Sequence, residues 1–333
     1  MPREPERLDL RTKLLGLLLR EELNRDLASA AAAADVDVDL ARRLWRALGF
    51  PEPADRLAFG DNDIAAFALV QAAVDSDLLT EETVLRLARA MGTTMARLAD
   101  WEVATLVDEM ERDVEHGRAD SRLGVALTLA EQVAPRFEDV LVQVWRRHLT
   151  AAAARMEALG AKDAELRTTT MTVGFADLSR FTTLSNQLDD AALGVLVEKF
   201  EERGADVITL GGGRVIKTLG DAMLYVTVDP VVATRIALEL VSGVGSRDDV
   251  PAIRVGLATG SVVSRLGDVF GPPVNLAARL SHVARSNRVL VDEETARSLG
   301  PDFATRSLPP RPLRGFGNVS PITVTQRRSF RSR

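Results

Sequence analysis

Six polar side chains in the C-terminal half of the chain have types and spacings that suit phosphate-ester chemistry. They are Asp177, Lys217, Asp221, Asp268, Asn275 and Arg279. Two carboxylates can hold divalent cations, and a lysine with a carboxylate can read a nucleobase. An amide and a guanidinium can hold a ribose and a reacting phosphate. No short motif elsewhere in the chain is as informative as this set.

The first pair of carboxylates is predicted to bind metal. Asp177 ends an apolar, β-rich run, and Asp221 follows Gly220 at a predicted hairpin corner. Taken singly, a helix N-cap and ordinary turn chemistry explain these two aspartates. Brought together on neighbouring strands, they could bridge two magnesium ions, one of which would activate a hydroxyl nucleophile. Main-chain amides near Phe181 and Thr182 are predicted to cradle a triphosphate where the next helix begins.

Lys217 and Asp268 are predicted to recognise a base. Lys217 precedes Asp221 by four residues, and this even spacing predicts that both lie on one face of a strand. Asp268 is predicted to lie in a loop. Taken alone, Lys217 is a surface residue, although the chain has only four lysines. Together the pair can donate to N1 of adenine and accept from its 6-amino group, whereas guanine would leave mismatches that cost about 1–3 kcal/mol each.

Asn275 and Arg279 are predicted to share one helix face because they are four residues apart. Leu276 and Leu280 fall on another face and are predicted to pack inward. A solvated polar stripe explains either polar residue alone. In a functional reading, the amide holds the ribose and the guanidinium meets charge that develops on the α-phosphate.

The composition limits the possible sites and partners. The chain has 333 residues, of which 46% are hydrophobic and 27% charged, no cysteine and three histidines. Any metal must therefore be held mainly by carboxylates, which favours magnesium or manganese. A net charge of −6 gives no support for a nucleic-acid partner. The sequence predicts no membrane span and no secretory signal, and we therefore expect a cytoplasmic protein.

Two domains are predicted from the change of pattern along the chain. Residues 8–160 read as all-helical and end in a long connecting helix at 135–160. In this half, Asp61–Asp63 provide N-cap candidates, and Gly92 is predicted to end a helix. Residues 167–330 follow the order strand–helix–hairpin–helix–strand–helix–strand, which predicts an α+β fold with a ferredoxin-like core.

The C-terminal domain resembles the catalytic domain of the class III nucleotide cyclases over residues 170–328. The matching segments are VGFADLSRFT, GGRVIKTLGDAMLYV, RVGLATGSVV, GDVFGPPVNLAARL and NRVLVDEE. The resemblance implies a homodimer that converts ATP to cyclic AMP and pyrophosphate with two Mg²⁺ or Mn²⁺ ions per active site. One subunit would supply Asp177 and Asp221, and the other would supply the remaining four residues. Lys217 with Asp268 matches adenylate specificity, and Arg314 lies where relatives place a basic contact to the triphosphate.

The N-terminal half resembles the helical regulatory domain of mycobacterial-type cyclases. The resemblance implies a regulatory domain that inhibits the catalytic part and that in some members responds to pH. Activation in place of inhibition stays open on the sequence. Our hypothesis is that this half holds the catalytic halves apart, with the helix 135–160 as the lever and His148 as a titrating group. The alternative for His148 is a partly buried helix residue without a switching role.

Three other functions remain open on the sequence. A guanylate or mixed-specificity cyclase is one, and a cyclase-fold protein that binds nucleotide without turnover is another. The segment ARRLWRALGFPEPADRLAFGDNDIAAF also resembles a helix-turn-helix, which would make the chain a DNA-binding regulator. Net negative charge and the complete polar set count against this last function.

Overall fold

A computed structural model describes residues 13–14, 16–53, 56–117, 122–158, 168–245, 250–265 and 267–327. The chain divides into two compact units, Met1–Arg155 and Met156–Arg333. The predicted domain bounds, residues 8, 160, 167 and 330, lie outside the described residues. Within the described ranges, no helix combines the length and apolar character that a bilayer span requires.

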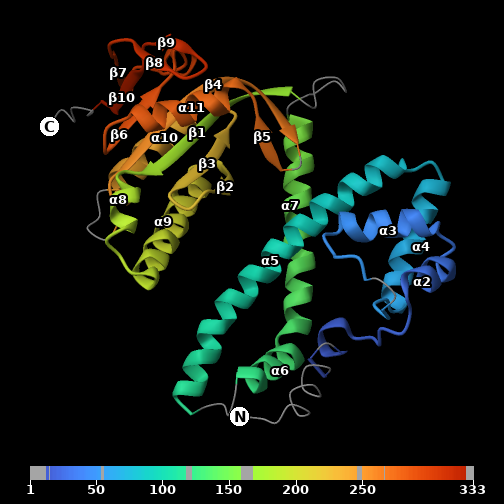
Figure 1. The fold of residues 1–333 in the computed structure, drawn as a ribbon. Helices are drawn as coiled ribbons and strands as arrows, with labels where there is room; N and C mark the ends of the chain where they lie inside the picture. The colour runs from blue at the N-terminus through green and yellow to red at the C-terminus, as the bar shows by residue number, and fades with distance from the viewer. Residues whose placement is uncertain are drawn as a thin grey trace. The chain divides into compact units, whose positions relative to one another are not determined.

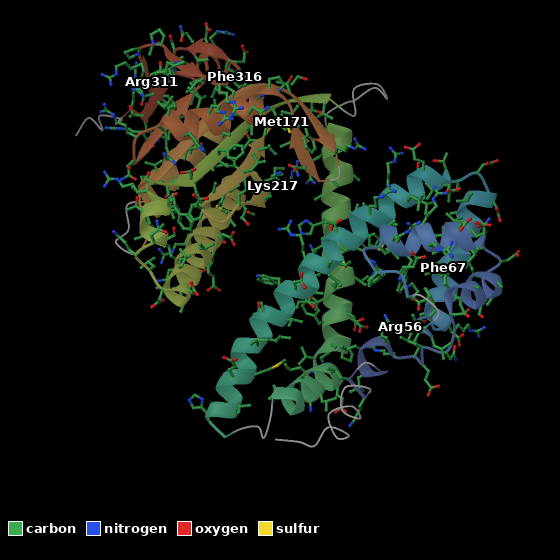
Figure 2. All side chains as sticks on the ribbon, viewed as in Figure 1. Arg56, Phe67, Met171, Lys217, Arg311 and Phe316 are labelled. Atoms are coloured by element: carbon green, nitrogen blue, oxygen red, sulfur yellow. The ribbon has the colours of Figure 1, made fainter. Side chains whose placement is uncertain are left out.

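The N-terminal unit is built from helices, as predicted. Its named helices, which Figure 1 labels, are α2 (Leu27–Ala33), α3 (Val38–Ala47), α4 (Asp61–Asp75), α5 (Glu81–Glu115), α6 (Arg122–Gln132) and α7 (Ala134–Ala158). The core gathers apolar side chains of α2 to α5 around Phe59, which is fully buried. Phe67 and Trp45 pack against this ring, and Figure 2 labels Phe67. The structure has a helix, α7, over most of the range 135–160 that was predicted for the connecting helix.

Two predictions about helix ends in this unit are wrong. The helix predicted to stop at Gly92 continues as α5 to Glu115. A Cβ at residue 92 would lie 2.2 Å from the carbonyl oxygen of Leu48, so this glycine permits close helix packing instead of ending the helix. The N-cap of α4 is Gly60, and Asp63 lies inside the first turn, where its carboxylate accepts the Gly60 N–H at 3.0 Å.

The C-terminal unit is an α+β domain. Its strands are β1 (Thr168–Leu178), β2 (Arg214–Thr218), β3 (Ala222–Thr227), β4 (Ile253–Arg265), β5 (Asp268–Phe270), β6 (Arg288–Val291), β7 (Phe303–Ser307), β8 (Arg311–Leu313), β9 (Gly317–Val319) and β10 (Ile322–Gln326). Its helices are α8 (Phe181–Ser185), α9 (Asp190–Leu210), α10 (Pro230–Glu239), the π-helix η1 (Leu240–Val244), α11 (Pro272–Val283) and α12 (Glu293–Arg297).

The main sheet confirms the predicted ferredoxin-like core. Its strand order is β2-β3-β1-β4-β6-β10-β7, with β5 paired to β4. The first four strands are antiparallel neighbours in the order that a β-α-β-β-α-β unit produces. Beyond them, β6 runs parallel to β4. Strands β7, β8 and β9 were not predicted, because they are short and their apolar and polar residues show little alternation.

Helices cover both faces of this sheet. Met223 and Tyr225 of β3 pack with α9 and α10 in the larger core, in which Phe200 is fully buried. Leu224 and Val226 of the same strand face the other way and pack with α11. Because alternate residues of β3 pack into two layers, all six of its positions are buried. The polar residues at the end of this strand are therefore held by a rigid neighbour.

Candidate functional site

The two predicted metal ligands lie at one end of β1 and β3. Asp177 pairs with Ala222 in the antiparallel register, and Asp221 immediately precedes that alanine. The Leu178 N–H donates to the main-chain oxygen of Asp221 at 2.8 Å, which ties the end of β1 to the β2–β3 turn. Gly220 has a φ of 75°, a conformation that favours glycine and closes the turn. The structure therefore brings the backbones of both aspartates together.

This arrangement suits a hard cation that also binds substrate. Magnesium is usually held by one or two carboxylates, with the remaining ligands supplied by water and substrate phosphates. The Asp177 side chain is 7% exposed and Asp221 is half-buried. Across the described ranges, no group of three or more His, Asp or Glu side chains could hold a metal on its own. The two aspartates therefore fit a metal ion whose coordination the substrate completes.

An arginine that was not predicted from the sequence contacts the first of these aspartates, Asp177. Arg254 of β4 stands opposite Asp177 in the β1–β4 register, and its Nε donates to Asp177 Oδ1 at 2.6 Å. Its Nη1 donates to the main-chain oxygen of His282 at 3.3 Å. A signal existed in the sequence, because Arg254 lies between Ile253 and Val255 in the first half of β4, which is otherwise apolar or small through Ala258.

Lys217 and Asp268 form a direct ion pair. The Lys217 Nζ donates to Asp268 Oδ2 at 2.5 Å, and the two side chains are 35% and 27% exposed. Burial alone would raise the pKa of the Asp268 carboxyl, but hydrogen bonds from Lys217 and the Val269 N–H, together with the lysine charge, lower that pKa overall. The pair therefore carries a donor and a charged acceptor side by side. Figure 2 labels Lys217 on β2.

Two predictions about the surroundings of this pair need correction. Lys217 and Asp221 do not share a strand face, because β2 ends at Thr218 and Asp221 belongs to the turn before β3. A register shift between Val215 and Lys217 also breaks the even alternation on which the prediction relied. Asp268 is not in a loop but begins β5, opposite Arg265 of β4.

Asn275 and Arg279 lie on the exposed face of α11, while Leu280 is buried beneath it. In the part of the chain that the structure describes, neither polar side chain has a hydrogen bond or ion pair with another residue. The structure therefore brings together the two aspartates through their backbones and Lys217 with Asp268 through an ion pair. It leaves the third pair, Asn275 with Arg279, exposed to solvent.

The turn after β1 has unused main-chain donors. Arg180 has a φ of 61° and is the N-cap of the short helix α8, with no side-chain cap. Thr183 and Leu184 donate to the Arg180 oxygen, both at 3.1 Å. Among the described residues, the N–H groups of Phe181 and Thr182 have no acceptor. Two adjacent free amides, which follow Asp177 by four and five residues, are suited to an anion.

Arg314 lies in the tight turn between β8 and β9, which form a separate two-stranded sheet. It is exposed, while its neighbours Leu313 and Phe316 pack under α11 with Leu280. Figure 2 labels Phe316 in this region. The turn is thus anchored by apolar contacts and presents the arginine to solvent.

Comparison with known proteins identifies the family. Residues 164–325 match the family described as the adenylate and guanylate cyclase catalytic domain. An adenylate cyclase of Streptomyces coelicolor is 36% identical over 97% of this chain and 92% of its own length. The chain belongs to the class III nucleotide cyclase family.

Two further relatives also span both units. An adenylate cyclase of Streptomyces griseus is 38% identical over 89% of this chain and 73% of its own length. A Mycobacterium tuberculosis protein named as a pH-sensitive adenylate cyclase is 30% identical over 84% of this chain and 72% of its own length. The similarity therefore extends beyond the catalytic domain into the helical N-terminal unit.

Proposed function

We propose that this chain is an adenylate cyclase that converts ATP to 3′,5′-cyclic AMP and pyrophosphate. The observation that carries the proposal is the ion pair of Lys217 with Asp268, whose Nζ and Oδ2 are 2.5 Å apart. Adenine needs a donor at N1 and an acceptor at its 6-amino group, and this pair supplies both. Three relatives named as adenylate cyclases support the same substrate.

Asp177 and Asp221 would hold two Mg²⁺ or Mn²⁺ ions with the substrate phosphates. When bound, such ions lower the pKa of a hydroxyl and offset negative charge on phosphate oxygens. The free N–H groups of Phe181 and Thr182 would bind the triphosphate next to these carboxylates. Arg314 would add a cation to the same group from the β8–β9 turn, which Leu313 and Phe316 anchor by apolar packing.

Asn275 and Arg279 would act on the ribose and the α-phosphate. The 3′-hydroxyl of ATP would give its proton to solvent as its oxygen bonds to the α-phosphorus, and the bond from that phosphorus to the bridging oxygen of pyrophosphate would break. Negative charge grows on the non-bridging oxygens during this exchange, and a fixed guanidinium stabilises it. The Asn275 amide can orient the ribose, so that the 3′-oxygen and the leaving group stay in line.

The complete site would form between two copies of the chain. Asn275 and Arg279 are exposed and without partners among the described residues, which is expected of groups that act on a substrate held across an interface. The long helices α5 and α7 also carry exposed apolar residues, with Trp101 68% and Trp145 58% exposed. Exposed aromatic side chains of this size are typical of protein interfaces. A homodimer would bury them and pair the two half-sites.

The N-terminal unit would regulate this dimer. Helix α7 is the last described element before β1 along the chain, so a change in helix pairing could alter how the catalytic halves meet. The pH-sensitive relative supports a pH signal. His148 is exposed on α7 and remains our proposed titrating group. A pH profile that is unchanged in His148→Asn would remove the histidine from this scheme.

The test is cyclic AMP formation from ATP by the full chain with Mn²⁺ or Mg²⁺, with GTP as the competing substrate. We expect cyclic AMP as the main product and a loss of at least about 100-fold in Asp177→Asn or Asp221→Asn. Cyclic GMP as the main product would favour the guanylate cyclase alternative. A folded dimer that forms neither product would reject the enzyme assignment.

Regulation is tested by comparing the full chain with residues 161–333 across the pH range. A more active fragment would identify the N-terminal unit as inhibitory, and a less active one as activating. Equal activities and equal pH profiles would reject a regulatory role for this unit.

A further inference from the structure

The guanidinium of Arg254 is bound to a carboxylate that is proposed to hold metal. Its Nε donates to Asp177 Oδ1 at 2.6 Å, and the two residues are directly opposite in the β1–β4 register. The Asp177 side chain is 7% exposed and the Arg254 side chain 26%. Such a shielded, charge-assisted hydrogen bond is stronger than a surface ion pair.

A second contact holds the same guanidinium in place. Arg254 Nη1 donates to the main-chain oxygen of His282 at 3.3 Å, in the last turn of α11. The C-terminal end of a helix carries partial negative charge, which favours a cation there. Arg254 is thus held between a carboxylate and a helix end and is not a freely moving surface arginine.

A metal ion and this guanidinium would compete for Asp177. Asp177 Oδ1 directs one of its lone pairs at Arg254 Nε, 2.6 Å away, and a divalent cation bound to the same carboxylate would repel the guanidinium. Asp221 has no ion pair among the described residues. The two proposed ligands therefore differ in the metal-free chain, because Asp177 is paired with Arg254 and Asp221 has no such partner among the described residues.

We propose that Arg254 is the resident counter-ion of Asp177 in the metal-free chain and that metal binding displaces it. The proposal rests on the assignment of Asp177 and Asp221 as metal ligands. Arg254 is then a positioning residue that keeps Asp177 paired while the site is empty and lowers the affinity for metal. By linkage, each partner weakens the binding of the other by the same factor.

The test is a titration of the full chain with Mn²⁺ in the absence of nucleotide, with free Mn²⁺ measured by electron paramagnetic resonance. Arg254→Gln should bind Mn²⁺ about tenfold more tightly, the size of one charge-assisted hydrogen bond. Its metal-free melting temperature should fall, because a buried carboxylate loses its partner. The rise in melting temperature on adding Mn²⁺ should exceed that of the unaltered chain.

Two further variants separate the ion pair from general charge. Arg288→Gln makes the same charge change in β6, where Arg288 is exposed and stands opposite Arg254 in the parallel register. We expect a change of about twofold or less there, because exposed charges are screened. Arg254→Lys keeps the charge without the planar guanidinium and should give an intermediate affinity.

Unchanged or weaker Mn²⁺ binding in Arg254→Gln would overturn the proposal, as would an equal gain in Arg288→Gln. If Arg254→Gln does not fold, the Arg254→Lys titration decides in the same way. Asp177→Asn tests the underlying assignment separately. If Asp177→Asn loses Mn²⁺ binding but Arg254→Gln shows no gain in Mn²⁺ affinity, the metal site stands and only the role of Arg254 is refuted. If Asp177→Asn keeps full Mn²⁺ affinity, the metal site and this proposal are refuted together.

Discussion

Exchange of the base-reading pair should change nucleotide preference. In the double variant Lys217→Glu with Asp268→Cys, the cation that donates to N1 of adenine becomes an acceptor, and the acceptor for the 6-amino group becomes a weak donor. Each position then mismatches adenine and matches guanine. At about 1–3 kcal/mol per mismatch, the two together cost about 2–6 kcal/mol, or about 30-fold to 10⁴-fold in kcat/KM for ATP.

The ion pair itself predicts how the single variants differ from the double. Lys217→Glu alone would place a second carboxylate beside Asp268, where the lysine Nζ now lies 2.5 Å from Oδ2. Like charges at this separation repel, so the single variant should lose both activity and thermal stability. Adding Asp268→Cys removes the repulsion and should recover stability. The two substitutions are therefore expected to be non-additive.

The assay is kcat/KM for ATP and for GTP, measured by the formation of each cyclic nucleotide, with melting temperatures as the control for folding. We expect the ratio of ATP to GTP turnover to fall by at least about 30-fold in the double variant. A folded double variant that keeps the original ratio would refute the assignment of Lys217 and Asp268 to base recognition.

Three further predictions follow from packing and ionisation. Gly92→Ala should destabilise the N-terminal unit by about 1–3 kcal/mol, because the added Cβ would overlap Leu48. Gly194→Ala in α9 has no atom within 4 Å of the added Cβ and should stabilise the chain by about 0.4–1 kcal/mol, so equal effects of the two variants in urea unfolding would contradict this reasoning. Because the pKa of Asp268 is lowered, its ionised carboxylate stabilises the fold fully above the ordinary pKa of 3.8, and this stability is lost as pH falls through the lower pKa of the folded chain. The difference in unfolding free energy between Asp268→Asn and the unaltered chain should therefore be constant from about pH 5 to 8. Burial raises the pKa of Asp292, so the folded chain binds a proton at this carboxyl more tightly than the unfolded chain does. The unaltered chain should therefore gain stability relative to Asp292→Asn as pH falls from about 7 to 4, and a loss of stability would show that this carboxylate is not desolvated.

Local patterns were sufficient to predict most of the C-terminal fold. Alternation and turn residues gave the β2–β3 hairpin, and the long periodic stretch gave α9. The position of Asp177 at the end of a buried strand also followed from its apolar neighbours. These features depend on contacts close in sequence, which a single chain records directly.

Some features that depend on pairing between distant residues were missed. Arg254 meets Asp177 only through the β1–β4 register, which joins residues 77 positions apart. The role of Gly92 depends on the approach of Leu48 from another helix, so a glycine that normally suggests a helix end instead lies inside one. The relation of Lys217 to Asp221 depended on a register shift in β2, which periodicity alone does not reveal.

The central claim is that two copies of the chain share each catalytic site, and mixing two inactive variants tests it most directly. Asp177→Asn removes a proposed metal ligand, and Arg279→Ala removes the group proposed to act on the α-phosphate, so each variant alone should form almost no cyclic AMP. Random pairing of subunits would give about half mixed dimers with one intact site of two, and hence about a quarter of the unaltered activity. A mixture that exchanges subunits yet stays as inactive as its components would contradict a shared site.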